Sequence, residues 1–134
     1  IISSQACLIS NQRLLAEDTT KLEKAKTLVD VMEGHLRSRA YYSVTANMRG
    51  ETPEDVAHQV LEHTAISGLR GPTIAKVYSQ DGVGWYAATV IIRKRSLTDA
   101  VNRLRQAGGT SVTVTDLNYV FNSACEAQAR LTGS

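Results

Sequence analysis

Cysteine is scarce in this 134-residue sequence, and the two that occur form no recognisable motif. Cys7 and Cys125 lie far apart, without CxxC spacing or the Cys/His spacing of a zinc site. A chain of this length can bury a hydrophobic core without a disulfide. We therefore expect two reduced thiols in a cytoplasmic protein, with no metal ligands in this part of the chain.

Charge of one sign and long apolar runs are also lacking. The net charge is +2, and the densest basic run, Arg93-Lys94-Arg95, ends a predicted strand. Nucleic-acid binding usually shows as a clustered basic face. No apolar run approaches the ~18 residues of a membrane span, and no signal-peptide pattern occurs. We expect a soluble protein with neither nucleic acid nor a membrane as partner.

Catalytic motifs are absent as well. His35, His58 and His63 fall on predicted helices without the i, i+4 spacing of metal ligands. No serine lies in a GxSxG elbow. Acids such as Glu54 and Asp99 stand at predicted helix starts, where capping and the helix dipole explain them. From the residues alone we predict a binding module and name no catalytic residue.

The first forty residues contain an apolar stretch and one long helix. Ala6–Ile9 predicts a strand, and Thr19 or Thr20 can cap a helix that runs to about Arg39. Apolar residues recur in that helix at three- and four-residue spacing, so it must pack against something. Because the chain begins with Ile1 rather than Met, we interpret this part as the end of a larger, truncated domain.

From Tyr41 onward, the pattern is that of a complete small domain. Strands alternate apolar and polar residues, helices begin at Thr52-Pro53 and at Ser96, Asp81-Gly82 marks a hairpin, and Gly108-Gly109 ends a helix. The predicted elements are a strand 41–48, a helix from 53, strands 73–79 and 85–93, a helix from 97, and a strand 111–117.

This order predicts an α+β, ferredoxin-like βαββαβ fold, a four-stranded antiparallel sheet with two helices on one face. The helix-covered face should take Tyr42, Val44, Ala46, Val112 and Val114. The other face carries Ser43, Thr45, Asn47, Thr113 and Thr115, which are too polar for a dry core. We expect that face to be wet or half covered by another subunit, as in a small-molecule regulatory module.

The segment SGLRGPTIAKV, residues 67–77, joins the first domain helix to the second strand. Pro72 lacks an N–H and therefore suits the start of an edge strand. Gly71 relieves the steric restriction before proline, and Gly68 can take a left-handed helix cap. The loop is predicted to be rigid whether or not it meets a ligand.

Several stretches together resemble one enzyme family. They are SSQACLISN, YYSVTANMRGETPEDVA, SGLRGPTIAKVYS, WYAATVIIRKRSLTDAVNRLRQAGG and VTVTDLNYVF. In this order they are similar to the C-terminal part of long-form ATP phosphoribosyltransferase, up to about Phe121. The resemblance implies residues 1–40 as a remnant of the catalytic region, 41–121 as a ferredoxin-like regulatory domain, and 122–134 as a tail.

The resemblance also implies an activity for the parent protein. That family is a glycosyltransferase that joins ATP to phosphoribosyl pyrophosphate with magnesium and releases pyrophosphate, the first step of histidine biosynthesis. Its regulatory domain binds L-histidine for allosteric feedback inhibition, and the family forms dimers and hexamers. The phosphoribosyl pyrophosphate loop lies upstream of SSQACLI, so this chain alone should be inactive and need no cofactor.

By the same resemblance, the histidine contacts fall on five positions: Asn47, Leu69, Thr73, Ile91 and Ser111. Asn47 and the two hydroxyls would meet the charged groups of the amino acid, whereas Leu69 and Ile91 would supply an apolar wall. Many bacterial members carry an acid where this chain has Asn47. A neutral amide there holds an ammonium group less strongly than a carboxylate does.

Two other hypotheses come from different classes of protein. A free-standing ferredoxin-like sensor resembling PII signal proteins would bind a nucleotide and a partner protein, but it would have no use for the N-terminal strand and helix. Single-stranded RNA binding needs stacking aromatics on the open face of the central strands. Tyr41 is available there, but Phe121 falls outside the predicted sheet.

Overall fold

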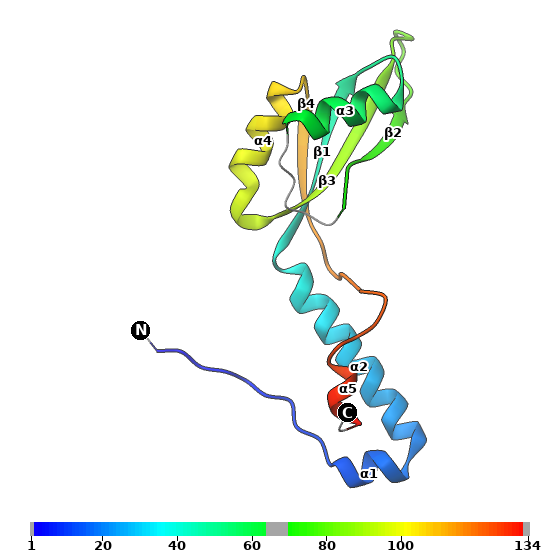
Figure 1. The fold of residues 1–134 in the computed structure, drawn as a ribbon, viewed down its shortest axis with the longest axis vertical. Helices are drawn as coiled ribbons and strands as arrows, with labels where there is room; N and C mark the ends of the chain where they lie inside the picture. The colour runs from blue at the N-terminus through cyan, green and yellow to red at the C-terminus, as the bar shows by residue number, and fades with distance from the viewer. Residues whose placement is uncertain (1, 64–69, 133–134) are drawn as a thin grey trace. The chain divides into compact units, whose positions relative to one another are not determined.

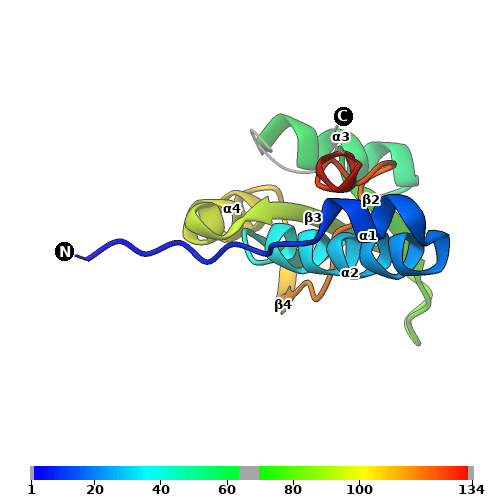
Figure 2. The ribbon, with the colours of Figure 1, turned by 90° about the horizontal axis from the view of Figure 1, so that it is seen from below.

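The computed structural model describes residues 2–63 and 70–132, which divide into two compact units (Figures 1 and 2). The sheet unit is Ser38–Asn118, and the helical unit combines the chain up to Arg37 with the chain from Tyr119 onward. The predicted domain limits of 1–40, 41–121 and 122–134 stay a prediction. Within the described residues, no helix has the length and apolar character needed to cross a membrane.

The sheet unit is a ferredoxin-like domain, as predicted. Its antiparallel strands have the order β2-β3-β1-β4, and both helices lie on one face of the sheet (Figure 1). The elements are β1 (Tyr41–Arg49), α3 (Pro53–His63), β2 (Thr73–Val77), β3 (Trp85–Arg93), a 3₁₀ turn at Lys94–Ser96, α4 (Leu97–Gln106) and β4 (Thr110–Asp116). Because β2 is an edge strand, the position of Pro72 directly before it agrees with the prediction.

The core lies between the two helices and every second residue of the central strands. The fully buried members are Val44, Ala46, Met48, Val56, Val60, Ala88 and Leu104. Tyr42 and Val112 pack partly buried against this core, which confirms the predicted inward faces. Val114 lies opposite Val44 but is 39% exposed, because β4 is the other edge strand.

The first helix of the sheet unit begins as its sequence predicts, and the second does not. Thr52 Oγ1 accepts a hydrogen bond from the Asp55 N–H at 3.1 Å, directly before Pro53. Ser96 makes no capping bond, because its backbone (φ −100°, ψ 10°) leaves the extended conformation that an N-cap needs. Gly108, at φ +97°, ends α4 in the predicted left-handed conformation.

Removing the Thr52 cap should measurably weaken the sheet unit. Thr52→Ala leaves an N–H of the first turn of α3 without its partner, so we expect the free energy of unfolding to fall by about 1 kcal/mol. Urea unfolding followed by circular dichroism measures the change. Thr98→Ala, at an exposed position within α4, is the matched control and should change stability by less than about 0.5 kcal/mol. Equal losses in the two variants would contradict the capping role.

The helical unit contains α1 (Gln12–Glu17), α2 (Thr19–Ser38, whose last residue belongs to the sheet unit) and α5 (Gln128–Leu131). The predicted strand at Ala6–Ile9 is wrong: the segment has no regular structure, since no strand within the described part of this unit offers it hydrogen-bond partners. The cap of α2 is Asp18, whose Oδ1 accepts from the Lys21 N–H at 3.1 Å, rather than Thr19 or Thr20.

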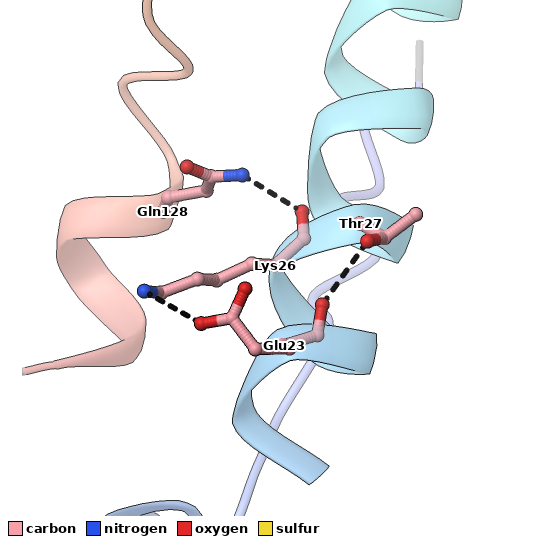
Figure 3. Close-up of polar contacts among 4 residues, drawn as sticks. All are labelled: Glu23, Lys26, Thr27 and Gln128. Atoms are coloured by element: carbon pink, nitrogen blue, oxygen red, sulfur yellow. Dashed lines mark hydrogen bonds and ion pairs between the residues drawn. The ribbon is translucent and has the colours of Figure 1, made fainter. Parts of the chain in front are cut away.

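The chain after Asn118 packs along α2. The Val120 N–H donates to the Gly34 carbonyl oxygen at 2.9 Å, and the Gln128 side-chain amide donates to the Lys26 carbonyl oxygen at 3.0 Å (Figure 3). A Cβ on Gly34 would stand only 3.0 Å from the Phe121 ring. The glycine therefore allows the ring, which stacks on Tyr119, to lie close against the helix.

Candidate ligand site on the open face of the sheet

Three of the five predicted site residues lie on one face of the sheet. Asn47 belongs to β1, Thr73 to β2 and Ile91 to β3. The alternate residues of β1 and β3 are buried under the helices, so these positions lie on the opposite, open face. In the pairing of β2 with β3, Thr73 lies opposite Thr89, so Thr73 belongs to the same face. The strands therefore place these side chains on one face but in different rows: Asn47 pairs with Ala87 and Ile91 with Ser43, which is roughly 13 Å along β3, and Thr73 stands in the row between them.

A row of four threonines crosses the middle of this face. Thr73, Thr89, Thr45 and Thr113 stand directly opposite one another on β2, β3, β1 and β4. The hydroxyls of Thr45 and Thr89 are hydrogen-bonded at 2.8 Å. The prediction that the open face is polar is thus confirmed. Thr89 is not among the predicted ligand contacts, although its place in the alternating strand 85–93 puts it on this face.

The rows around Asn47 contain short side chains and an arginine that contacts a tryptophan ring. Asn47 pairs with Ala87, and Ala87 pairs with Ala75. In the row of residues next to the threonines, the side chains on β3 and β2 are therefore short. In the next row, the Arg49 guanidinium lies 4.8 Å from the centre of the Trp85 ring. Asn47 is half-buried, and its neighbours toward β2 in the same row are both alanines.

Ser111 stands at an irregularity of β4. The register of β4 against β1 shifts between Thr45 and Asn47, and Ser111 has φ +50°, in the left-handed region. Such a conformation in a residue other than glycine costs roughly 1–3 kcal/mol, and residues of this kind cluster at functional sites. The neighbouring Thr110 hydroxyl donates to the Asn47 carbonyl oxygen at 3.2 Å. The bulge thus places Ser111 at the Asn47 end of the face, whereas Leu69 lies outside the described residues.

The open face carries neutral oxygen atoms, with one arginine at each end. Arg49 lies at one end of β1, and Arg93, which lies 5.3 Å from the ring centre of Tyr41, marks the other. Within the described strands, the residues of this face include no carboxylate. A ligand with a carboxylate and an ammonium group would meet hydroxyl and amide partners for both groups.

These observations define a ferredoxin-like α+β domain with a polar open face. Residues 38–119 match the family described as HisG, C-terminal domain, and the chain belongs to this family.

Several relatives of this chain are longer proteins, and the chain matches only part of each. It is 39% identical over 126 residues to ATP phosphoribosyltransferase 1, chloroplastic, of Arabidopsis thaliana, a match over 91% of this chain and 31% of the relative. ATP phosphoribosyltransferase 2, chloroplastic, of the same plant is 36% identical over 91% of this chain and 30% of its own length. An ATP phosphoribosyltransferase of Pelotomaculum thermopropionicum is 26% identical over 71% of this chain and 30% of its own. The chain thus spans under a third of these relatives.

Among solved structures, a crystal structure of Arabidopsis thaliana PII bound to citrate matches with a TM-score of 0.43 and 19% identity. The match covers 59% of this chain and 78% of that one. No conclusion about function follows from a likeness at this level.

Proposed function

We propose that this chain is the C-terminal regulatory part of an ATP phosphoribosyltransferase, and that the open face of its sheet binds L-histidine as the feedback inhibitor. Membership in the HisG C-terminal domain family supports the enzyme class. The observation that carries the proposal of a ligand is that Asn47, Thr73 and Ile91 share one polar face of the sheet.

Each of these side chains has a distinct role in holding the amino acid. The Asn47 amide oxygen accepts from the ammonium group, and the Thr73 hydroxyl donates to the carboxylate. Ile91 gives the imidazole ring an apolar contact. Ser111, held in its left-handed conformation at the bulge, supplies a second hydroxyl beside Asn47. Leu69 would complete the wall from the loop before β2.

The rest of the parent enzyme would carry the chemistry. In this proposal, ATP, phosphoribosyl pyrophosphate and magnesium bind outside these 134 residues, and the chain alone has no transferase activity. Histidine acts by linkage, because it favours one arrangement of a homo-oligomer, a dimer or hexamer. A coupling of about 1–3 kcal/mol gives roughly 5–150-fold inhibition. The cytoplasmic location stays a prediction, and the two Arabidopsis relatives are named chloroplastic.

Calorimetric titration of the chain with L-histidine and, separately, with ATP tests the proposal. We expect heat of binding with histidine only. In Thr73→Val, the loss of one hydrogen bond to a charged carboxylate, worth about 1.5–3 kcal/mol, should weaken binding at least about tenfold. Thr115→Val changes the same residue type on the same face at the far edge strand and should bind like the wild type.

Three results would contradict this proposal. Binding of ATP without histidine would favour the PII-like sensor. Equal weakening in the two threonine variants would place the ligand elsewhere. An absence of heat with histidine at concentrations where sedimentation shows an assembled chain would exclude histidine as the ligand of this domain.

A further inference from the structure

A second cluster of functional groups lies in the helical unit, apart from the residues of the open face. It consists of Asp30 and Glu33 on α2 and Cys125 on the segment that follows the sheet. Their nearest carboxylate and thiol atoms all lie within 4.8 Å of one another, and all three residues are partly buried. The proposed histidine site uses none of them.

The local fold explains why these groups meet. Asp30 and Glu33 are three residues apart, so they share one face of α2. The segment that carries Cys125 is anchored on both sides. Its Val120 N–H bonds to the Gly34 carbonyl oxygen, and its Gln128 amide bonds to the Lys26 carbonyl oxygen, as Figure 3 shows for the second bond. The two anchors lie on either side of the turn that presents the carboxylates, so Cys125 faces this turn.

The Cys125 thiol and the Glu33 carboxylate are hydrogen-bonding neighbours. A hydrogen bond with Cys125 lowers the pKa of Glu33, and the same bond raises the pKa of the Cys125 thiol. The Arg37 guanidinium lies 3.8 Å from the Glu33 carboxylate and also favours its ionised form. A metal ion bound here would have to displace the thiol proton, because a cysteine binds metals as the thiolate.

We propose that Asp30, Glu33 and Cys125 form a binding site for a thiophilic divalent cation of the zinc type, which links the 119–132 segment to α2. One thiolate with two carboxylates suits zinc, which accepts both sulfur and oxygen ligands. Magnesium and calcium prefer sites built of oxygen atoms. Around tetrahedral zinc, the ligand atoms would stand about 3.5 Å apart, so shifts of about 1 Å close the site and leave one position for water.

The chain offers its own control, because its only other thiol, Cys7, is exposed and lies outside the cluster. Cys7→Ser retains the three proposed ligands, and Cys125→Ser retains only the control thiol. The rate of alkylation by iodoacetamide is measured on each full-length variant with and without Zn²⁺. We expect Zn²⁺ to slow alkylation of Cys125 at least about tenfold and to leave Cys7 unaffected.

A third variant separates a three-ligand site from binding by the thiol alone. Asp30→Asn with Glu33→Gln, in the Cys7→Ser background, should lose the protection by Zn²⁺ while circular dichroism shows an unchanged helix content. Equal alkylation rates of Cys125 with and without Zn²⁺ in the Cys7→Ser variant would overturn the proposal. Protection that survives in the third variant would overturn it too. The first of these tests needs no substitution within the site.

Discussion

Leu104→Ala should lower the free energy of unfolding of the sheet unit by about 3–5 kcal/mol. Leu104 lies on α4 and is 0% exposed, within the cluster formed by the helices and the central strands. Its truncation removes apolar surface from the core and leaves a cavity among buried side chains that collapse only partly around it. Against a typical total of about 5–15 kcal/mol, this loss would leave the unit marginally stable.

The same residue type on the neighbouring helix supplies the control. Leu61 on α3 is 53% exposed, and Leu61→Ala should cost less than about 1 kcal/mol. Urea unfolding followed by fluorescence measures both, because the single tryptophan, Trp85, belongs to the sheet unit. Similar losses in the two variants would show that the helices do not pack as described.

The sequence predicts the sheet unit well because its signals are local and agree with one another. Strict alternation identifies β3 with its observed bounds, Trp85–Arg93, and the Thr52-Pro53 cap identifies the start of α3. Ala6–Ile9 is apolar like a strand, but a strand also needs a neighbour, which local pattern does not reveal. Ser96 has the composition of a cap, but the 3₁₀ turn before α4 sets a different backbone conformation.

The candidate site also has features that local sequence pattern predicts and features that depend on strand pairing. Alternation places Asn47 and Ile91 on the open face, because each belongs to a strand whose other face is apolar. The bond between Thr45 and Thr89 depends on the register of β1 against β3, which no local pattern encodes. The bulge at Ser111 also arises from pairing. The cluster around Cys125 does not follow from local pattern, because Cys125 lies far along the chain from Asp30 and Glu33.

Asn47→Asp should strengthen the binding of L-histidine about tenfold, if the open face is the histidine site. The described residues of that face offer an ammonium group only neutral oxygens. A carboxylate at position 47 would replace a hydrogen bond between the ammonium group and a neutral oxygen by an ion pair with a negative charge, which is stronger. A gain of about 1.4 kcal/mol corresponds to a factor of ten in the dissociation constant. The partly buried position of Asn47 limits screening by solvent.

Asn102→Asp is the matched control, because it lowers the net charge by the same unit at an exposed position on α4. Calorimetric titration should show tighter binding in Asn47→Asp, weaker binding in Asn47→Ala, and no change in Asn102→Asp. Equal effects of the two aspartates would mean that histidine responds to overall charge and does not contact residue 47. Weaker binding in Asn47→Asp alone would place the ligand carboxylate, rather than its ammonium group, beside this strand, because a second negative charge would then repel it.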